Sequence, residues 1–531
     1  MRRARPDAAA SPRTVTATAL LPLAALLLAP TCRAELKTVA SVEARTTYTD
    51  NVQLAPDGEA RSLWIAELVP GLAFSGHSRR VQLDAGYQAH LYGYSRADSA
   101  ANRSRESEFH GALHAEAVDE LLFIDASGAY RQQQVSAFGL PVADNQYLSA
   151  NRAQVKSYRI SPYLRHSFGP QLRGELHYTY DAVSSDQPGF AHSTGNCMQG
   201  TLAGAGTARL GWSLHASRQR LDSGVSPAST ATSYRLDAQF ALLTQWRLTA
   251  SAGHERYTYA QQVGDLPSGK SWSVGMIWTP SSRTSVMASL GKRYFGNSNA
   301  FEALHRTRRS AWSLSYSTDV TTARDQFLLP ASVSTAALLD GLFAAGVADP
   351  VQRQLAVAAF IKANGLPASI ANNINYFSNR YVLQKQLQLG AVFTLPRSAL
   401  VLSLFDNRRQ ALSAVGSDSA LLGPVSAFYN DNVRQQGGGV TLNLRLRPHT
   451  TLNLSATAIR VRGLGEADAA GIQAGSSRTR MLRAGLTQQL GRQLNAAIEV
   501  RRQQGNVQGA VGGNAGAYHE NALVLQVSQI F

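Results

Sequence analysis

The sequence has few cysteines, few charged residues and no apolar run that could form a spanning helix. Two of its 531 residues are cysteine, 16% are charged and 44% are hydrophobic. Cys32 lies in the expected leader, so Cys197 is left alone; a disulfide framework is excluded, and we expect an inert loop thiol. Beyond the leader no apolar run approaches the roughly 20 residues that a spanning helix needs. This combination suits a transmembrane β-barrel, whose strands turn every second residue to lipid.

Motifs of catalysis and cofactor binding are also missing. No Cys or His cluster has metal-ligand spacing, and neither H-E-x-x-H nor G-x-S-x-G occurs. Gly264–Ser271 matches the phosphate-loop pattern, but a strand-like segment follows it where phosphate binding needs a helix. Gly437–Gly439 is interpreted as a flexible strand entry. We therefore assign no catalytic, cofactor-binding or metal-binding residue, and predict a protein that is not an enzyme and uses no cofactor.

Residues 1–34 have the features of a cleaved secretory signal peptide. An arginine-rich start precedes the apolar segment Ala17–Ala29, and Cys32 and Ala34 supply small residues at the −3 and −1 positions. A lipoprotein anchor at Cys32 is the alternative, but the residues before it match a lipobox poorly. The mature chain would then be 35–531, exported to the outer membrane of a Gram-negative cell.

The chain is basic, which narrows the classes of partner. Its formal charge is +16, and about +12 remains without the leader's five arginines and one aspartate. Nucleic acid, an anionic membrane surface and an acidic polymer all fit such a balance. No basic helix or aromatic-laced basic stripe occurs, so we expect no nucleic acid. The expected partners are outer-membrane lipid and lipopolysaccharide, with anionic polysaccharide as a further candidate.

Alternating polarity runs through most of the mature chain. Between residues 81 and 91 apolar side chains occupy one face, and Gln82, Asp84 and His90 lie on the other. The segments 172–181, 234–242 and 440–447 repeat the pattern. These strands are longer than those of soluble sheets, and their connections alternate between short and long. The sequence predicts an all-β fold: a large antiparallel transmembrane β-barrel of about 22 strands, within a range of about 18 to 24.

The strand number comes from a parity argument. About fourteen strands between Leu36 and Asp319 keep phase, and one outward strand is then missing before residue 378. Val320–Leu329 is the best candidate for it. Aromatic residues near strand ends suggest an interfacial girdle: Trp64, Tyr94, Tyr130, Tyr180, Trp246, Tyr259 and Trp278.

Two features stand out from the strand pattern. Residues 331–377 have helical spacing with cap and stop signals, and predict a helical insert that either caps a loop or plugs the lumen. The chain ends on an alternating strand, Ala522–Phe531, whose Leu523, Leu525, Val527 and Phe531 should face lipid. We expect this strand to close the barrel and to be read by the outer-membrane assembly machinery.

Charged residues of both signs fall on the expected inner faces, where they would line a wet or plugged lumen with a basic excess suited to anionic polymers. They are Asp84, Arg173, Glu175, Asp237, Arg445 and Arg447.

Several segments, in their order along the chain, resemble a known family. They are Thr47–Val52, Leu54–Gly58, Ser161–Gly169, Leu176–Asp181, His305–Asp319 and, after the helical insert, Phe377–Tyr381. They look like the outer-membrane β-barrel proteins associated with the PEP-CTERM protein-sorting and exopolysaccharide system of Gram-negative bacteria. The resemblance covers roughly 40–531. It implies an outer-membrane location and a link to exopolysaccharide export or surface assembly, and it supplies no functional residues.

The sequence thus predicts a porin-like pore or assembly component of an exopolysaccharide or PEP-CTERM pathway. A barrel-type lipid-modifying hydrolase is one alternative; it needs a Ser–His pair on the outer wall of the barrel. The histidines on or near strands are His177, His215, His254 and His305. A soluble all-β adhesin is the other alternative.

Overall fold

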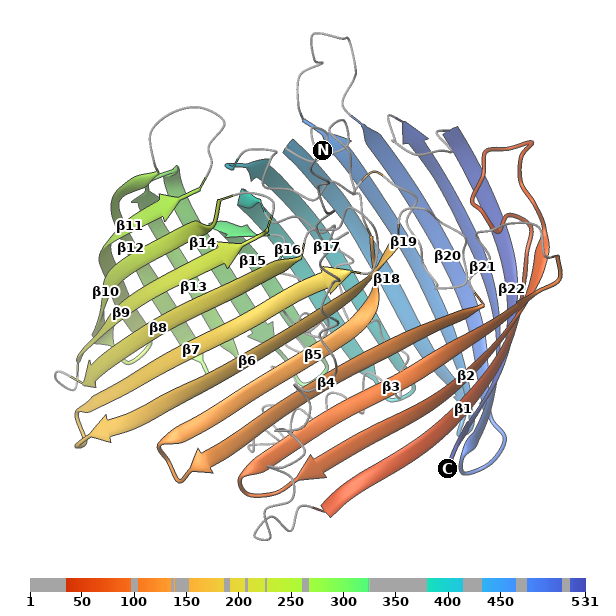
Figure 1. Cartoon of the computed structure of the whole chain (residues 1–531), viewed down its shortest axis with the longest axis horizontal. Coiled ribbons are helices and arrows are strands. Elements are labelled where there is room, and N and C mark those ends of the chain that lie inside the picture. The colour runs from red at the N-terminus through yellow and green to blue at the C-terminus, as the bar shows by residue number, and fades with distance from the viewer. Residues whose placement is uncertain are drawn as a thin grey trace, which may run out of the picture.

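The computed structural model is a closed barrel of 22 antiparallel strands (Figure 1). It describes residues 35–96, 104–134, 138, 152–185, 192–205, 209–224, 227–259, 267–322, 324, 380–413, 432–464, 475–508 and 516–531. The strands are β1 (Glu35–Thr49), β2 (Leu63–His77), β3 (Val81–Tyr94), β4 (Arg105–Val118), β5 (Leu122–Gln134), β6 (Arg152–Phe168), β7 (Leu172–Ser185), β8 (Ser193–Ala205), β9 (Leu210–Asp222), β10 (Ser229–Leu243), β11 (Trp246–Thr258), β12 (Ser268–Ser281), β13 (Thr284–Arg293), β14 (Gly296–Arg306), β15 (Ser310–Thr322), β16 (Tyr381–Leu395), β17 (Ser398–Ala411), β18 (Asn432–Arg447), β19 (Thr450–Gly463), β20 (Ser476–Gln489), β21 (Leu494–Gln508) and β22 (Gly516–Ile530).

Each strand pairs with the next, and the last pairs with the first. The closing β1–β22 ladder runs from Ser41 opposite Ile530 to Thr49 opposite Ala522. The predicted barrel, its strand number and the role of the C-terminal strand in closing it are therefore confirmed. Because the strand number is even, β1 starts and β22 finishes at the same end (Figure 1). Connections such as 244–245 and 396–397 lie at that end, which we call the short-turn end; the other is the long-loop end.

The position of the added strand was predicted wrongly. Val320, Thr321 and Thr322 complete β15, and fifteen strands already lie between Glu35 and Thr322. The connection between β13 and β14 is only Tyr294–Phe295, although it lies at the long-loop end. The parity argument expected long connections at this end, so the two-residue turn between β13 and β14 was not recognised as a connection between strands. The predicted signal peptide (1–34) and helical insert (331–377) lie outside the described residues.

Two further expectations were wrong. Cys197 lies within β8 rather than in a loop, and among the described residues it forms no disulfide. Gly437–Gly439 lie in the middle of β18, not at its start. A Cβ on Gly437 would approach the Phe405 ring to 2.7 Å and the Ala458 carbonyl oxygen to 2.7 Å. These glycines therefore let neighbouring side chains lie flat against the strand.

The two faces of the sheet differ in polarity. Large apolar residues with solvent-exposed side chains occur at alternate positions around the whole barrel, for example Leu68, Leu236 and Leu482. Leu525 and Val527 of β22, and Phe531 directly after it, belong to this face, as predicted. We call it the outer wall, because the alternate positions carry the residues that make contacts across the interior. A continuous apolar outer wall is what a membrane barrel presents to lipid, and it argues against a soluble adhesin.

The aromatic girdle is only partly present. Trp246 and Trp278 stack on the outer wall at the short-turn end, with ring centroids 5.4 Å apart. Trp64 is exposed near the opposite end. Tyr94 and Tyr259, in contrast, pack into buried clusters. Within the described residues no helix is long and apolar enough to cross a membrane.

The wall assignment predicts opposite responses at two adjacent residues near the middle of β18. Val440 is 44% exposed and lies opposite Leu402 and Ala456, whereas Thr441 points inward. We expect Val440→Arg to lower the free energy of unfolding by about 2 to 4 kcal/mol, the cost of a guanidinium at the bilayer midplane. Thr441→Arg should cost less than about 1 kcal/mol. Urea unfolding in lipid vesicles measures both; equal losses would refute the assignment.

Candidate functional site: the interior of the barrel

The inner wall is polar, and several of its charged residues form ion pairs with one another. The predicted inward residues Glu175 and Asp237 accept hydrogen bonds from Arg165 (Nε–Oε1, 2.8 Å) and Arg235 (Nε–Oδ2, 2.9 Å). The sequence predicted both carboxylates as lumen residues and placed Arg235 on the same face as Asp237, but it did not predict either ion pair. A spacing of two along one strand, as in Arg235 and Asp237, was the available signal, because such residues share a face.

The other four predicted lumen residues are not drawn into one site. Asp84 lies opposite Ser75 and Ala112, and Arg173 opposite Ser167 and Ala203. Arg445 faces Thr451, and the register shifts before Arg447. These residues are distributed around the barrel, so they do not form a common binding site.

A buried polar cluster joins the first three strands. Glu67 accepts a hydrogen bond from His90, with 2.7 Å between Oε1 and Nδ1, and its Oε2 lies 3.3 Å from Nη1 of Arg45. Arg45 also donates to Glu43 at 2.7 Å. The Glu67 side chain is 3% exposed. A carboxylate this buried is stable only because charged donors surround it.

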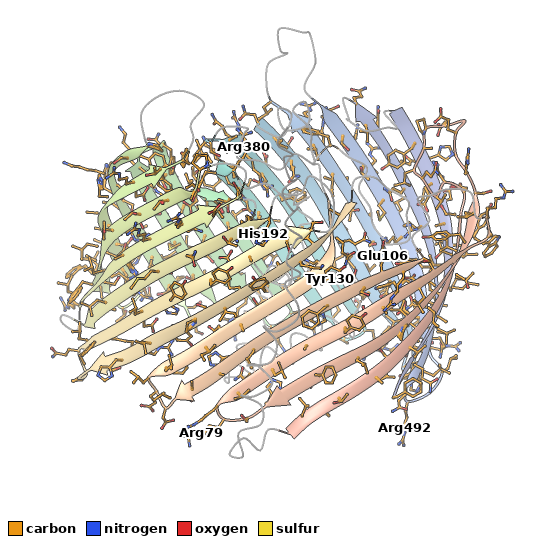
Figure 2. All side chains as sticks on the ribbon, in the orientation of Figure 1. Arg79, Glu106, Tyr130, His192, Arg380 and Arg492 are labelled. Atoms are coloured by element: carbon orange, nitrogen blue, oxygen red, sulfur yellow. The ribbon has the colours of Figure 1, made fainter. Side chains whose placement is uncertain are left out.

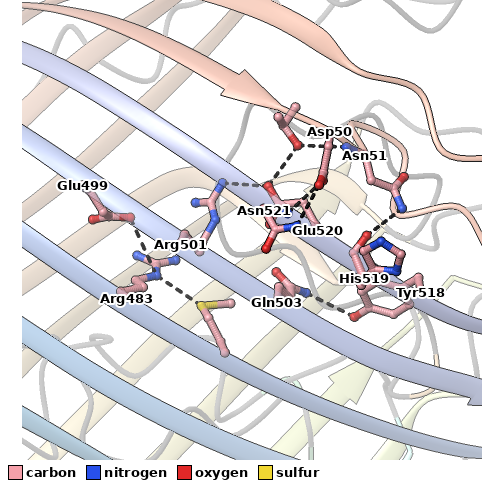
Figure 3. A network of polar contacts seen from close by, with 12 residues as sticks. Asp50, Asn51, Arg483, Glu499, Arg501, Gln503, Tyr518, His519, Glu520 and Asn521 are labelled. Atoms are coloured by element: carbon pink, nitrogen blue, oxygen red, sulfur yellow. Dashed lines mark hydrogen bonds and ion pairs between the residues drawn. The ribbon is translucent and has the colours of Figure 1, made fainter. Parts of the chain in front are cut away.

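A second network lies beside the closing seam (Figure 3). Arg501 and Glu520 form an ion pair of 3.3 Å on β21 and β22, and both side chains are fully buried. The Thr49 hydroxyl on β1 donates to the same Glu520 oxygen at 3.0 Å. Gln503 donates to the Tyr518 hydroxyl at 3.1 Å. The interaction between Thr49 and Glu520 joins the first strand to the last by side chains as well as by the ladder.

Two residues beyond strand ends make contacts across the interior. Arg324, after β15, forms an ion pair with Asp181 on β7 and donates from Nε to the Ser193 hydroxyl on β8 at 2.8 Å. Phe138, after β5, packs against Val433 and Val461 on β18 and β19. Several strands separate the members of each pair along the wall. Both contacts narrow the interior near the long-loop end.

Aromatic rings and one arginine gather where the β13–β14 hairpin is short. Tyr257, Tyr259 and Tyr381 form a buried cluster, against which Tyr294 packs. Burial raises the pKa of the Tyr259 and Tyr294 hydroxyls, so both remain neutral. The arginine is Arg293. It donates through Nε to both oxygens of Glu255, at 2.9 and 3.1 Å, and forms an ion pair with Asp319.

The interior is lined by polar side chains. Within the ranges that the structure describes, no three His, Cys, Asp or Glu side chains are grouped closely enough to hold a metal ion. Figure 2 shows side chains on both walls, with Arg79 and Arg492 at the short-turn end and Arg380 near the other.

A barrel hydrolase needs a Ser–His pair on its outer wall. His177 and His215 are on the inner wall, where they contact Glu175 and Asp237. His305 Nδ1 forms a hydrogen bond with the Thr284 hydroxyl at 2.9 Å. On the outer wall His254 Nε2 lies 3.4 Å from the Ser268 hydroxyl. No carboxylate or amide among the described residues bonds to His254, so nothing orients its ring as a catalytic base requires.

No family model matches the chain, and a search of curated proteins gave no match. Among solved structures it is similar to the FrpB iron transporter from Neisseria meningitidis. The F3-3 variant of that protein gives a TM-score of 0.50 at 10% identity, over 93% of this chain and 82% of the transporter. The F5-1 variant gives 0.51 at 10% identity, over 93% and 83%. At this level of identity the likeness shows a shared barrel fold.

Proposed function

We propose that this protein is an outer-membrane β-barrel that gives a polar cargo a route through the membrane. The observation that carries the proposal is the contrast between the walls: the outer one is apolar, whereas the inner one holds buried ion pairs and hydroxyl groups. Such a barrel separates lipid from a polar path. Its fold resembles that of FrpB, which is named an iron transporter, and this supports transport over a purely structural role.

For the cargo we propose a polysaccharide, in a PEP-CTERM-linked export or surface-assembly pathway. The support is the ordered set of segments, from Thr47–Val52 to Phe377–Tyr381, that resembles that family. The interior adds little support for a preference for anionic cargo. Several of its carboxylates are paired with its own arginines, as in Arg165–Glu175 and Arg501–Glu520, so part of the expected basic excess is neutralised within the wall.

Planar-bilayer recording tests the transport proposal. If the Arg324–Asp181 and Phe138–Val433 contacts narrow the path, the native barrel should conduct weakly and Arg324→Ala/Phe138→Ala should conduct several-fold more. Arg308→Ala, in an exposed short turn, is the control and should match the native barrel. Absence of conductance in all three forms would overturn the pore and favour an assembly or docking role.

The same preparations test the hydrolase alternative. We expect no release of fatty acid from phospholipid or lipopolysaccharide, and no difference between the native chain and Ser268→Ala. Fatty-acid release that Ser268→Ala abolishes would instead establish an enzyme, with Ser268 and His254 on the outer wall.

A further inference from the structure

The outer wall carries a concentration of positive charge on five neighbouring strands near the long-loop end. The charge comes from arginines whose side chains are all exposed. We call these residues the arginine patch: Arg408 on β17, Arg434 on β18, Arg460 and Arg462 on β19, Arg478 and Arg480 on β20, and Arg502 on β21.

Register places several of these arginines directly opposite one another. Arg408 lies opposite Arg434, and Arg434 opposite Arg462, so one row of guanidinium groups crosses three strands. In the next row Arg460 lies opposite Arg478. Directly opposed side chains have Cβ atoms about 5 Å apart, and like charges at that spacing destabilise a sheet. Because these guanidinium groups repel one another, negative charge close to them would stabilise the sheet.

The described part of the protein supplies little of that counter-charge. Asp406 accepts from Arg434, with 3.0 Å between Nε and Oδ1. After reorientation of its amide, Gln504 accepts from Arg502 at 3.0 and 3.1 Å, but it is neutral. No carboxylate among the described residues pairs with Arg460, Arg462 or Arg478. Their five-donor guanidinium groups remain available to an external anion.

The position of the patch identifies the anion. On the same outer wall, two to six residues nearer the middle of the strands, the exposed side chains become apolar at Leu404, Val440, Leu482 and Val500. A group that reaches the patch must therefore sit where the apolar band stops. The head group of a membrane lipid sits there, whereas a polymer passing through the interior does not. Basic clusters beside a membrane span bind anionic head groups in this way.

We propose that the arginine patch binds the phosphate groups of outer-leaflet lipopolysaccharide. Long loops mark the outer side of a barrel, so the patch faces the leaflet that holds this glycolipid. Guanidinium groups bind phosphate oxygens in bidentate pairs, which suits a row of closely spaced arginines. This inference rests on the outer-membrane placement and orientation proposed above, and it does not depend on what the interior transports.

The test compares three forms of the full-length barrel, folded in detergent without lipopolysaccharide. They are the native chain, a patch variant and a control that loses the same charge at the short-turn end. The patch variant is R460Q/R462Q/R478Q/R480Q; the control is R283Q/R308Q/R397Q/R492Q, all exposed in the native chain. Binding of purified rough-type lipopolysaccharide is measured for each. We expect a tenfold or greater rise in Kd for the patch variant and less than twofold for the control.

A second variant separates binding from structural damage. Arg460→Gln/Arg478→Gln removes one directly opposed pair, so it should raise the urea midpoint in lipopolysaccharide-free detergent while weakening lipopolysaccharide binding. A merely structural role would lower the midpoint. Dephosphorylated lipopolysaccharide should bind the native chain as weakly as the patch variant does.

Three outcomes would overturn the inference: equal Kd for native and patch variants, equal losses for patch and control variants, or stronger binding of phosphatidylglycerol vesicles or alginate than of lipopolysaccharide. Heat-modifiable gel mobility of the native chain checks the barrel independently. A native chain without it would refute the proposed function, whereas a normal barrel that binds no lipopolysaccharide refutes this inference alone.

Discussion

Replacing Arg501 with methionine is expected to lower the free energy of unfolding by about 3 to 5 kcal/mol, the usual cost of breaking a buried ion pair from one side. Arg501 and Glu520 are both fully buried, 3.3 Å apart. Without the guanidinium, the Glu520 carboxylate loses this ion pair while it remains fully buried. The Thr49 hydroxyl, at 3.0 Å, cannot neutralise a charge.

Two companion variants show whether charge is the cause. Arg501→Met/Glu520→Gln removes both charges and keeps an oxygen for Thr49, so most of the lost stability should return. Arg502→Met changes the adjacent, exposed arginine of the outer wall and should alter stability by less than about 0.5 kcal/mol. Urea unfolding followed by tryptophan fluorescence measures all three. A double variant as unstable as Arg501→Met would assign the loss to packing.

Arg293→Met should produce the second large loss, about 2 to 3 kcal/mol. The loss is at or below the lower end of the range given above for a buried ion pair, because Asp319 is largely exposed and its ion pair with Arg293 therefore contributes little. One guanidinium at the end of β13 holds Glu255 on β11, at 2.9 and 3.1 Å, and Asp319 on β15. Each acceptor is two strands away from β13, so a single side chain joins the walls on either side of the short hairpin.

Arg293→Lys distinguishes geometry from charge. A lysine keeps the charge but lacks the planar fork that reaches two carboxylates, so its stability should lie between those of the native chain and Arg293→Met. Lys292→Met, the neighbouring outward residue, is the control and should be nearly neutral. If Arg293→Lys matched the native chain, the bifurcated contact of Arg293 Nε with both oxygens of Glu255 would contribute nothing measurable. Urea midpoints in vesicles are again the measurement.

Alternation and connection length were enough to predict the barrel, because the physical requirement is local. A strand between lipid and a polar interior must alternate apolar with polar residues. This alternation is visible within single segments such as Val81–Leu91 and Ala522–Phe531. The parity rule then predicted the strand number. It misplaced one strand because the Tyr294–Phe295 turn is short where a long loop was expected.

The contacts of the interior could not be predicted in the same way. Arg324 reaches Asp181 over 143 residues of sequence, and Thr49 reaches Glu520 over 471. No local sequence pattern predicts which inner-wall residues will contact each other across the interior once the barrel closes. The arginine patch is intermediate: its members alternate visibly along each strand, but only the cross-strand register brings Arg460 opposite Arg478.

The seam between β1 and β22 has a consequence for the order of folding. Its partners are separated by almost the whole chain, so their pairing has the largest loop-closure cost of any ladder in the barrel. Until Gly516–Ile530 is in place, β1 and β21 each present an unpaired edge to other chains. Completion of the barrel is thus tied to the docking of β22 between β21 and β1. An arrest just before that step would leave an open sheet with two edges prone to aggregation.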